Sequence, residues 1–243
     1  MRLSIVFAKR NIKEIIRDPL SFIFAIILPS FLLIIFQQFK IPNDAYLIKN
    51  FTPGIIVFGF SFITMFTATL ISKDKTSSLL FRLSAGPMKP FEYILGYFLS
   101  AIPLAIIQVI LFTFIAIPLG LALNLNTLYL ILLSIPVSFL YVFLGIIIGS
   151  ITTDKSAPGA SSVIVQLVCF TSGMYFSSDM LGKGFNFICD ILPFKSSVNI
   201  IKFALNNTIN NLALDVLTFI FYTLLAIVFS TLLFYKNLRK DVK

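Results

Sequence analysis

The sequence predicts an all-α membrane protein, a single transmembrane domain over residues 1–243 with six transmembrane helices. Of the 243 residues, 58% are hydrophobic and only 12% are charged. This charged share is about half that of a typical soluble domain. In addition, several stretches without Asp, Glu, Lys or Arg are long enough to cross the hydrocarbon core of a bilayer, which takes about 20 apolar residues.

The first segment, residues 1–18, is amphipathic rather than uniformly apolar. Its apolar and basic side chains recur at helical spacing on two faces: Ile5, Ala8, Ile12, Ile15 and Ile16 against Lys9, Lys13 and Arg17. This pattern predicts a helix in the membrane interface, which either anchors the N-terminus or contacts a partner. Asp18 and Pro19 suit the cap and the first residue of the next helix. No signal-peptide cleavage site follows, so we expect the first span to be retained.

Six spans follow this segment. The longest uncharged stretch, residues 93–153, is too long for one helix, and the turn-forming residues between Pro118 and Asn126 divide it. The predicted spans are about residues 19–39, 50–72, 94–119, 128–151, 156–178 and 213–235.

Basic residues predict the orientation of these spans. Of the 19 Lys and Arg residues, fourteen fall in the N-terminal segment, the loops after the second and fourth spans, and the C-terminal tail. The other five fall on the opposite side: Lys40, Lys49, Lys183, Lys195 and Lys202. Because basic residues are retained on the cytoplasmic side, we expect both ends in the cytoplasm. The abundance of Lys, Asn, Ile and Phe is typical of a bacterial cell-membrane protein.

Two segments between the spans are predicted to have other roles. Residues 73–92 form the largest cytoplasmic loop, with a short helix, Thr76 to Leu83, that ends before Gly86-Pro87. This helix is too apolar for a free loop, so we expect something to pack on it. On the outer side, residues 179–212 hold apolar pieces too short to cross, interrupted by Pro193. They predict a re-entrant helical hairpin, with an interfacial loop as the alternative.

This sequence lacks the residues that several functional classes of protein need. There is no His, and the predicted membrane core has no ionisable side chain, only the amides Gln108 and Gln166. Ion-coupled transporters and membrane enzymes need such groups; Asp179 and Asp190 are the only acids near each other in the outer segment. Cys169 and Cys189 match no metal or redox spacing, and the dispersed basic residues do not form a nucleic-acid surface.

The sequence also lacks the G-x-x-x-x-G-K-[ST] phosphate-binding motif. Energy for uphill transport must therefore come from another chain. Two readings remain open from the residues alone: a permease driven by a separate ATPase, and a passive channel or scaffold.

The order of these parts resembles the permease subunits of ABC transporters of the type-2 exporter class, over essentially the whole chain. The resemblance rests on Arg17 to Pro19 after the amphipathic segment, the short cytoplasmic helix, and LGIIIGS at Leu144 to Ser150. Its most specific part is Val168 to Phe194, similar to the fifth span and re-entrant segment of that family.

The resemblance implies that the short cytoplasmic helix is a coupling helix that docks on an ATPase subunit. The residues implied in this contact are Asp74, Lys75, Arg82, Leu83, Pro87 and Met88. The sequence departs from the family pattern at Ser78-Leu79, where Gly-Thr is usual, and at Tyr97, where Lys usually follows the glycine matched by Gly96. The residues implied in an outer gate are Ser172, Gly173, Asp179 and Pro193.

The resemblance further implies the partners and the mechanism. An ATP-binding cassette ATPase would carry ATP and Mg²⁺, with no cofactor or metal in this chain. A second permease subunit, most simply a second copy, would complete a pathway through the membrane. Such families export lipids, glycolipids, polysaccharides, drugs or peptides, and the 28 Phe residues would suit an amphipathic or lipid-like substrate.

Overall fold

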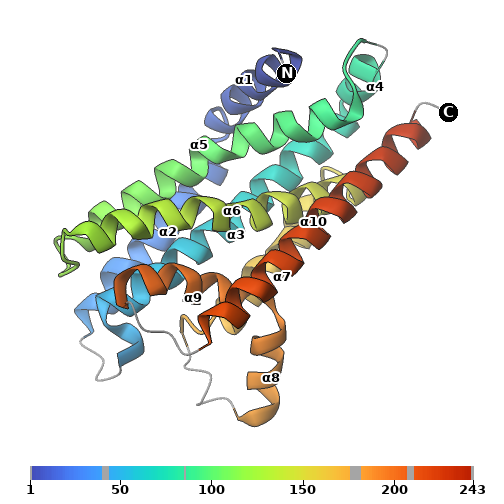
Figure 1. The fold of residues 1–243 in the computed structure, drawn as a ribbon. Coiled ribbons are helices and arrows are strands. Elements are labelled where there is room, and N and C mark those ends of the chain that lie inside the picture. Colours follow the sequence, from blue (N-terminus) through green and yellow to red (C-terminus); the bar gives the residue numbers. More distant parts are fainter. Residues whose placement is uncertain (1, 40–43, 85, 176–181, 207–210, 242–243) are drawn as a thin grey trace.

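The computed structural model describes residues 2–39, 44–84, 86–175, 182–206 and 211–241, and the regular structure in them is helical (Figure 1). The helices are α1 (Arg2–Ile16), α2 (Pro19–Gln38), the 3-10 helix η1 (Asp44–Tyr46), α3 (Ile48–Thr76), α4 (Leu79–Ser84), α5 (Pro90–Ala116), α6 (Leu125–Ile151), α7 (Ala157–Thr171), α8 (Lys183–Ile191), α9 (Pro193–Asn206) and α10 (Leu212–Asp241).

Each of the six predicted spans corresponds to a helix: α2, α3, α5, α6, α7 and α10. Within the described residues, four of them (α3, α5, α6 and α10) are long and apolar enough to cross a bilayer. The described apolar parts of α2 (Ile23–Gln38) and α7 (Ala157–Thr171) are shorter. The protein is therefore an α-helical membrane protein, and the crossing of the membrane by all six helices stays a prediction.

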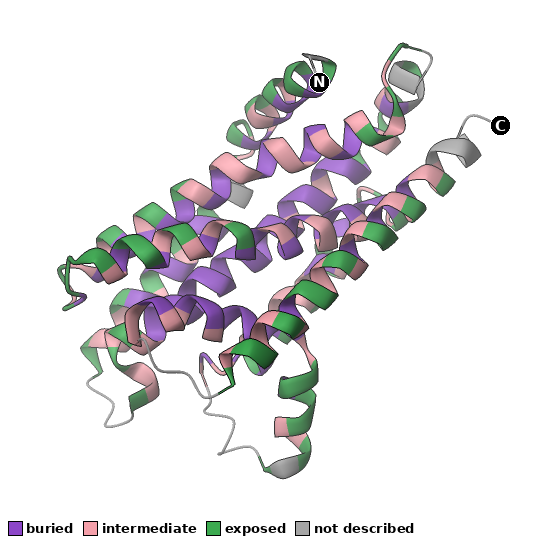
Figure 2. Ribbon diagram, in the orientation of Figure 1, coloured by how far each residue is buried: buried purple, intermediate pink, exposed green. Residues whose placement is uncertain are grey.

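Helix α3 is the central element of the bundle. In its most apolar part 89% of the residues are buried, against 17% for α10, and Figure 2 shows the same contrast along the two helices. Helices α2, α5, α6, α7 and α9 all pack on α3. The apolar residues exposed on α10 need no protein contact if lipid solvates them.

Two glycines allow α6 to approach α3 closely. A Cβ atom at Gly145 would lie 2.7 Å from the carbonyl oxygen of Thr64, and one at Gly149 would lie 2.7 Å from that of Ala68. Both distances are shorter than van der Waals contact. Because residues four apart share one face of a helix, this G-x-x-x-G pair forms the small-residue packing face that is common in membrane bundles.

The connection between α5 and α6 falls where turn residues predicted it. Gly120 has φ of +113°, a conformation that side chains disfavour. Asn124 caps α6 through its side-chain oxygen, which accepts a hydrogen bond from the Thr127 amide at 3.2 Å. The break at Pro193 is also confirmed, since α8 ends at Ile191 and α9 begins at Pro193.

The outer segment contains a helical pair, α8 and α9, that precedes α10. Helix α9 packs on α3, α6 and α10, whereas α8 projects from the bundle (Figure 1). Whether this pair enters the membrane stays a prediction.

The end of the bundle opposite α8 and α9 contains the start of α1, helix α4 and the last turns of α10 (Figure 1). Both chain ends therefore lie at the same end.

Three boundaries differ from the prediction. The short cytoplasmic helix was expected from Thr76 to Leu83, but α4 runs from Leu79 to Ser84 because Thr76 still belongs to α3. The fifth span was expected to reach residue 178, but α7 ends at Thr171.

The second span was expected to end at Ser72, with charged residues 73–75 in the loop, but α3 continues to Thr76. The extra turn carries Lys73, Asp74 and Lys75 into contact with other helices. Their partners are distant in sequence, so the charges alone suggested a loop.

Candidate coupling region at the end of α3

The last turn of α3 holds a buried carboxylate. The Asp74 side chain is 1% exposed, and its Oδ2 atom accepts hydrogen bonds from Arg10 Nη1 at 2.7 Å and Tyr97 Oη at 2.8 Å. Arg10 Nη1 also donates to Asn11 Oδ1 at 3.0 Å. A buried charge is tolerated only when it is paired and hydrogen-bonded. These contacts therefore tie α3 to α1 and α5.

Helix α1 docks on α5 next to this carboxylate. The Phe7 ring meets the Tyr93 and Tyr97 rings edge to face, with centroid distances of 5.7 and 5.0 Å. Gly96 leaves room for this ring, because a Cβ atom there would lie 2.5 Å from Phe7 Cδ1. The side of α1 that faces the protein therefore includes Phe7, rather than all the isoleucines that the amphipathic pattern suggested.

The predicted apolar face of α1 is divided in the structure. Ala8 and Ile15 are buried, but Ile5 and Ile16 are exposed, at 50% and 67%. Leu3 and Val6 are also exposed. Helix α1 thus packs on its own chain with one face and leaves an apolar edge on another, which suits the interfacial position that the sequence predicts.

Two lysines flank Asp74 and bind different helices. Lys73 Nζ lies 3.0 Å from Glu14 Oε1 on α1, and this hydrogen-bonded ammonium lowers the pKa of the Glu14 carboxyl. Lys75 Nζ donates to the Ser150 and Thr152 carbonyl oxygens at 2.6 and 3.1 Å. These carbonyls end α6, where unpaired carbonyls and the helix dipole favour a cation.

Helix α10 joins the same region. Asn237 Nδ2 donates to the Ser150 carbonyl oxygen at 2.6 Å. The last turn of α3 therefore brings together three groups of polar contacts through its consecutive residues Lys73, Asp74 and Lys75. These groups are here called the α3 junction, whose members are Arg10, Glu14, Lys73, Asp74, Lys75, Tyr97, Ser150, Thr152 and Asn237. It joins α1, α3, α5, α6 and α10 in one place.

Helix α4 follows the α3 junction directly and lies on the surface. Ser78 turns the chain with φ of +55°, and Leu80 is 3% exposed. Helix α4 packs on α3 and α10. Arg82 is exposed, and its Nη2 atom is 3.4 Å from the Ser77 carbonyl oxygen. The apolar character that argued against a free loop is explained in part by this packing of Leu80.

The residues expected to contact an ATPase divide into two groups. Asp74 and Lys75 bind inside the chain, whereas Arg82 and Pro87 are exposed and Met88 is half-buried. The Leu83 side chain lies outside the described part of the structure. The ATPase contact itself stays a prediction.

Of the residues expected at the outer gate, Ser172 and Gly173 directly follow α7 and Pro193 begins α9. Ser172 and Pro193 are buried, and Gly173 has φ of +75°. Asp179 lies outside the described residues. The chain after α7 packs on α3, because Met174 contacts Gly54, and Tyr46 Oη donates to the Tyr175 carbonyl oxygen at 2.6 Å.

An aromatic cluster at this end was not anticipated from the sequence. It consists of Phe36, Tyr46, Phe51, Phe58 and Tyr175. Aromatic pairs of this kind stabilise packing beyond their buried area. The five residues come from α2, η1, α3 and the chain after α7, so no local pattern could have identified the cluster.

A family model described as ABC-2 type transporter matches residues 3–206. The chain belongs to the ABC-2 type transporter family. It is a membrane permease subunit of that family. Comparison with curated proteins gives no match.

The structure gives this ABC-2 permease a physical account of two features noted in its sequence. LGIIIGS contains Gly145 and Gly149, the contact face of α6 on α3. At the position where the family resemblance implies Lys, Tyr97 supplies a hydrogen-bond donor to Asp74. Sequence reasoning named Asp74 as a site residue and Tyr97 only as a departure from the family pattern, and it paired neither with Arg10, because the three lie on separate helices.

Proposed function

We propose that this permease is the membrane-spanning subunit of an ATP-driven exporter, powered by a separate ATP-binding cassette ATPase. The observation that carries the proposal is the α3 junction directly beside the surface helix α4. A push on α4 would reach α3 through the two-residue link of Ser77 and Ser78. From α3 it would pass to α1, α5 and α6 through the bonds of Asp74, Lys73 and Lys75.

In this proposal the residues near α4 have separate roles. Arg82 and Pro87, which are exposed, would meet the ATPase, together with Leu83 and Met88. Asp74 and Lys75 are positioning residues that hold α3 to its neighbours. ATP and Mg²⁺ would bind on the ATPase, whose closure would tilt the helices of this chain. Both chain ends and α4 would then face the cytoplasm, as the distribution of basic residues predicts.

The proposal includes a second permease subunit, a second copy in the simplest case. The exposed side of α7 carries Gln166 between Val163 and Phe170. The exposed residues of α10 from Ala213 to Leu232 are apolar throughout. An amide that faces lipid loses its hydrogen bonds, so α7 is the better surface for a partner or for a polar pathway. An amphipathic substrate would suit the mixed polar and aromatic side of α7.

Copurification with the ATPase tests the proposal. The full-length chain should retain a P-loop ATPase, and Arg82→Asp combined with Leu83→Asp should remove it, because two carboxylates would replace a cation and an apolar contact. Lys155→Asp is the matched control, since Lys155 is an exposed cation after α6 and outside the α3 junction. Retention by the double variant, or no ATPase binding in any nucleotide state, contradicts the proposal. Flux through the purified chain alone in liposomes would instead indicate a passive channel.

A further inference from the structure

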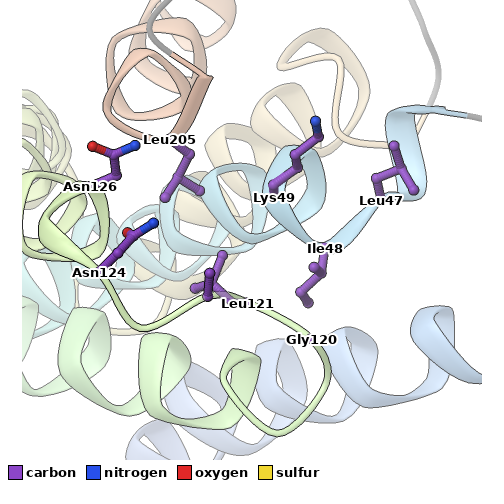
Figure 3. Close-up of a pocket in the computed structure, with 9 residues that line it drawn as sticks. Leu47, Ile48, Lys49, Gly120, Leu121, Asn124, Asn126 and Leu205 are labelled. Atoms are coloured by element: carbon purple, nitrogen blue, oxygen red, sulfur yellow. The ribbon is translucent and has the colours of Figure 1, made fainter.

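A cavity of about 260 Å³ lies at the end of the bundle opposite α4. Its walls come from the start of α3, the connection between α5 and α6, and the end of α9. Figure 3 shows Leu205 of α9 and Leu121 of the connection directed toward each other, with Asn124 between them. Ile48 and Ala122 add further aliphatic surface. The cavity is therefore mainly apolar and has a few polar groups.

The backbone around this cavity is held in place by its own hydrogen bonds. Thr127 Oγ1 donates to the Ala122 carbonyl oxygen at 2.5 Å, and the Thr127 amide donates to Asn124 Oδ1. The turn at Gly120 precedes these bonds. Ligand sites are usually preformed hollows of this type, with apolar walls and a few placed polar groups.

Two lysines lie beside the cavity. Lys49 lines it, and Figure 3 shows its ammonium directed away from Gly120 and Leu121. Lys202 is one turn before Leu205 on α9, so both share one face of that helix. Burial, together with the neighbouring Lys49 ammonium, lowers the pKa of Lys202. Lys202 therefore lies within one helical turn of Leu205, which lines the cavity together with Lys49.

Neither lysine has an acidic partner among the described residues. Of the acids on neighbouring elements, Asp190 pairs with Lys195 at 2.6 Å and Asp215 accepts from Asn199 at 3.0 Å. Asp44 of η1 forms no ion pair with either lysine within the described residues. Two cations near one cavity, neither of them in an ion pair within the described residues, favour an external anion. The aliphatic walls below them favour a hydrocarbon chain on the same ligand.

We propose that this cavity binds an anionic phospholipid of the adjacent membrane leaflet, with its phosphate between Lys49 and Lys202 and the first part of an acyl chain against Leu121 and Leu205. The cavity lies where α3, α5 and α6 begin or end, which is the depth of lipid headgroups if these helices span the bilayer. Lysines at that depth attract anionic headgroups.

Lipid titration of the delipidated full-length chain, followed by native mass spectrometry, tests the proposal. The chain should bind one phosphatidylglycerol more tightly than phosphatidylcholine. Each ammonium near an anionic headgroup contributes about a five-fold change in affinity, so Lys49→Gln with Lys202→Gln should weaken phosphatidylglycerol binding roughly 30-fold. Lys195→Gln, which removes a cation from the same helix α9 outside the cavity, should leave it unchanged.

A second variant tests the contact with the acyl chain independently of the contact with the phosphate. Ala122 is exposed and lines the cavity, so Ala122→Phe should fill the cavity without disturbing the core and should weaken phosphatidylglycerol binding. If the double variant does not fold, each single lysine variant serves as the test, with an expected loss of phosphatidylglycerol affinity of about five-fold.

Four results would overturn the proposal. They are equal affinity for the two lipids, unchanged binding by both the lysine and Ala122→Phe variants, an equal loss in Lys195→Gln, and complete competition by inorganic phosphate at the concentration of lipid. The last would indicate a simple anion site. Because the readout is lipid binding and not transport, failure here leaves the proposed exporter function untouched.

Discussion

Asp74 carries an uneven set of hydrogen bonds. Its Oδ2 atom accepts from both Arg10 and Tyr97, while its Oδ1 atom is buried without a hydrogen bond among the described residues. The carboxylate therefore depends strongly on the Arg10 cation. Removing one member of a buried ion pair costs more than the pair itself contributes, because the remaining charge is left uncompensated.

Arg10→Met should accordingly lower the free energy of unfolding by about 1–3 kcal/mol, less than for a fully buried pair because the Arg10 side chain is 37% exposed. Thermal unfolding of the purified chain in detergent measures the loss as a decrease in Tm. Lys9→Met is the control, since Lys9 is exposed on the same helix. Combining Arg10→Met with Asp74→Asn should recover part of the loss, because the uncompensated charge disappears. If the Arg10→Met protein had the same Tm as the wild type, the stability of the fold would not depend on the ion pair between Arg10 and Asp74.

The α3–α6 pair depends on the absence of side chains at two positions of α6. The Thr64 hydroxyl also donates to the Tyr141 carbonyl oxygen at 2.8 Å, across the same contact. Small residues let membrane helices approach until such contacts form. The packing of α6 on the buried helix α3 therefore rests on backbone proximity rather than on large side chains.

Gly149→Ala should separate these helices, because its methyl group would lie 2.7 Å from the Ala68 carbonyl oxygen. Overpacking of this kind costs about 1–3 kcal/mol, again measurable as a lower Tm in detergent. Gly159→Ala on α7 is the matched control, since no atom lies within 4 Å of its added Cβ. Because alanine has a higher helix propensity than glycine, Gly159→Ala should leave the Tm unchanged or raise it. Equal effects at both positions would refute the close-packing argument.

The whole molecule has exposed surfaces of two kinds. The exposed residues of α10 are aliphatic and aromatic as far as Leu232, whereas α7 exposes the Gln166 amide. Lipid can solvate the apolar surface of α10, but the hydrogen-bonding groups of the Gln166 amide on α7 need protein or water as partners. A second subunit against α7 would also enclose a pathway between two bundles.

Disulfide cross-linking in membranes tests this assembly. In a chain in which Ser replaces Cys169 and Cys189, a single cysteine at position 166 should give a cross-linked dimer. A cysteine at position 221, where Phe221 is 59% exposed on α10, should not. Cross-linking at 221 but not 166 would place the partner on α10. Cross-linking at neither position would exclude an α7 interface between copies.

The sequence by itself determined the helical membrane class, the positions of the six apolar helices and the breaks at Gly120 and Pro193. Uncharged length and turn residues act locally, so both are visible in the chain order. Only the tertiary structure decided the α3 junction. Residues 73–75 looked like loop charges because Arg10, Tyr97 and Ser150, which bind Asp74 and Lys75, are distant in sequence. A helix can carry buried charge only where other helices neutralise it, and packing alone brings those partners together.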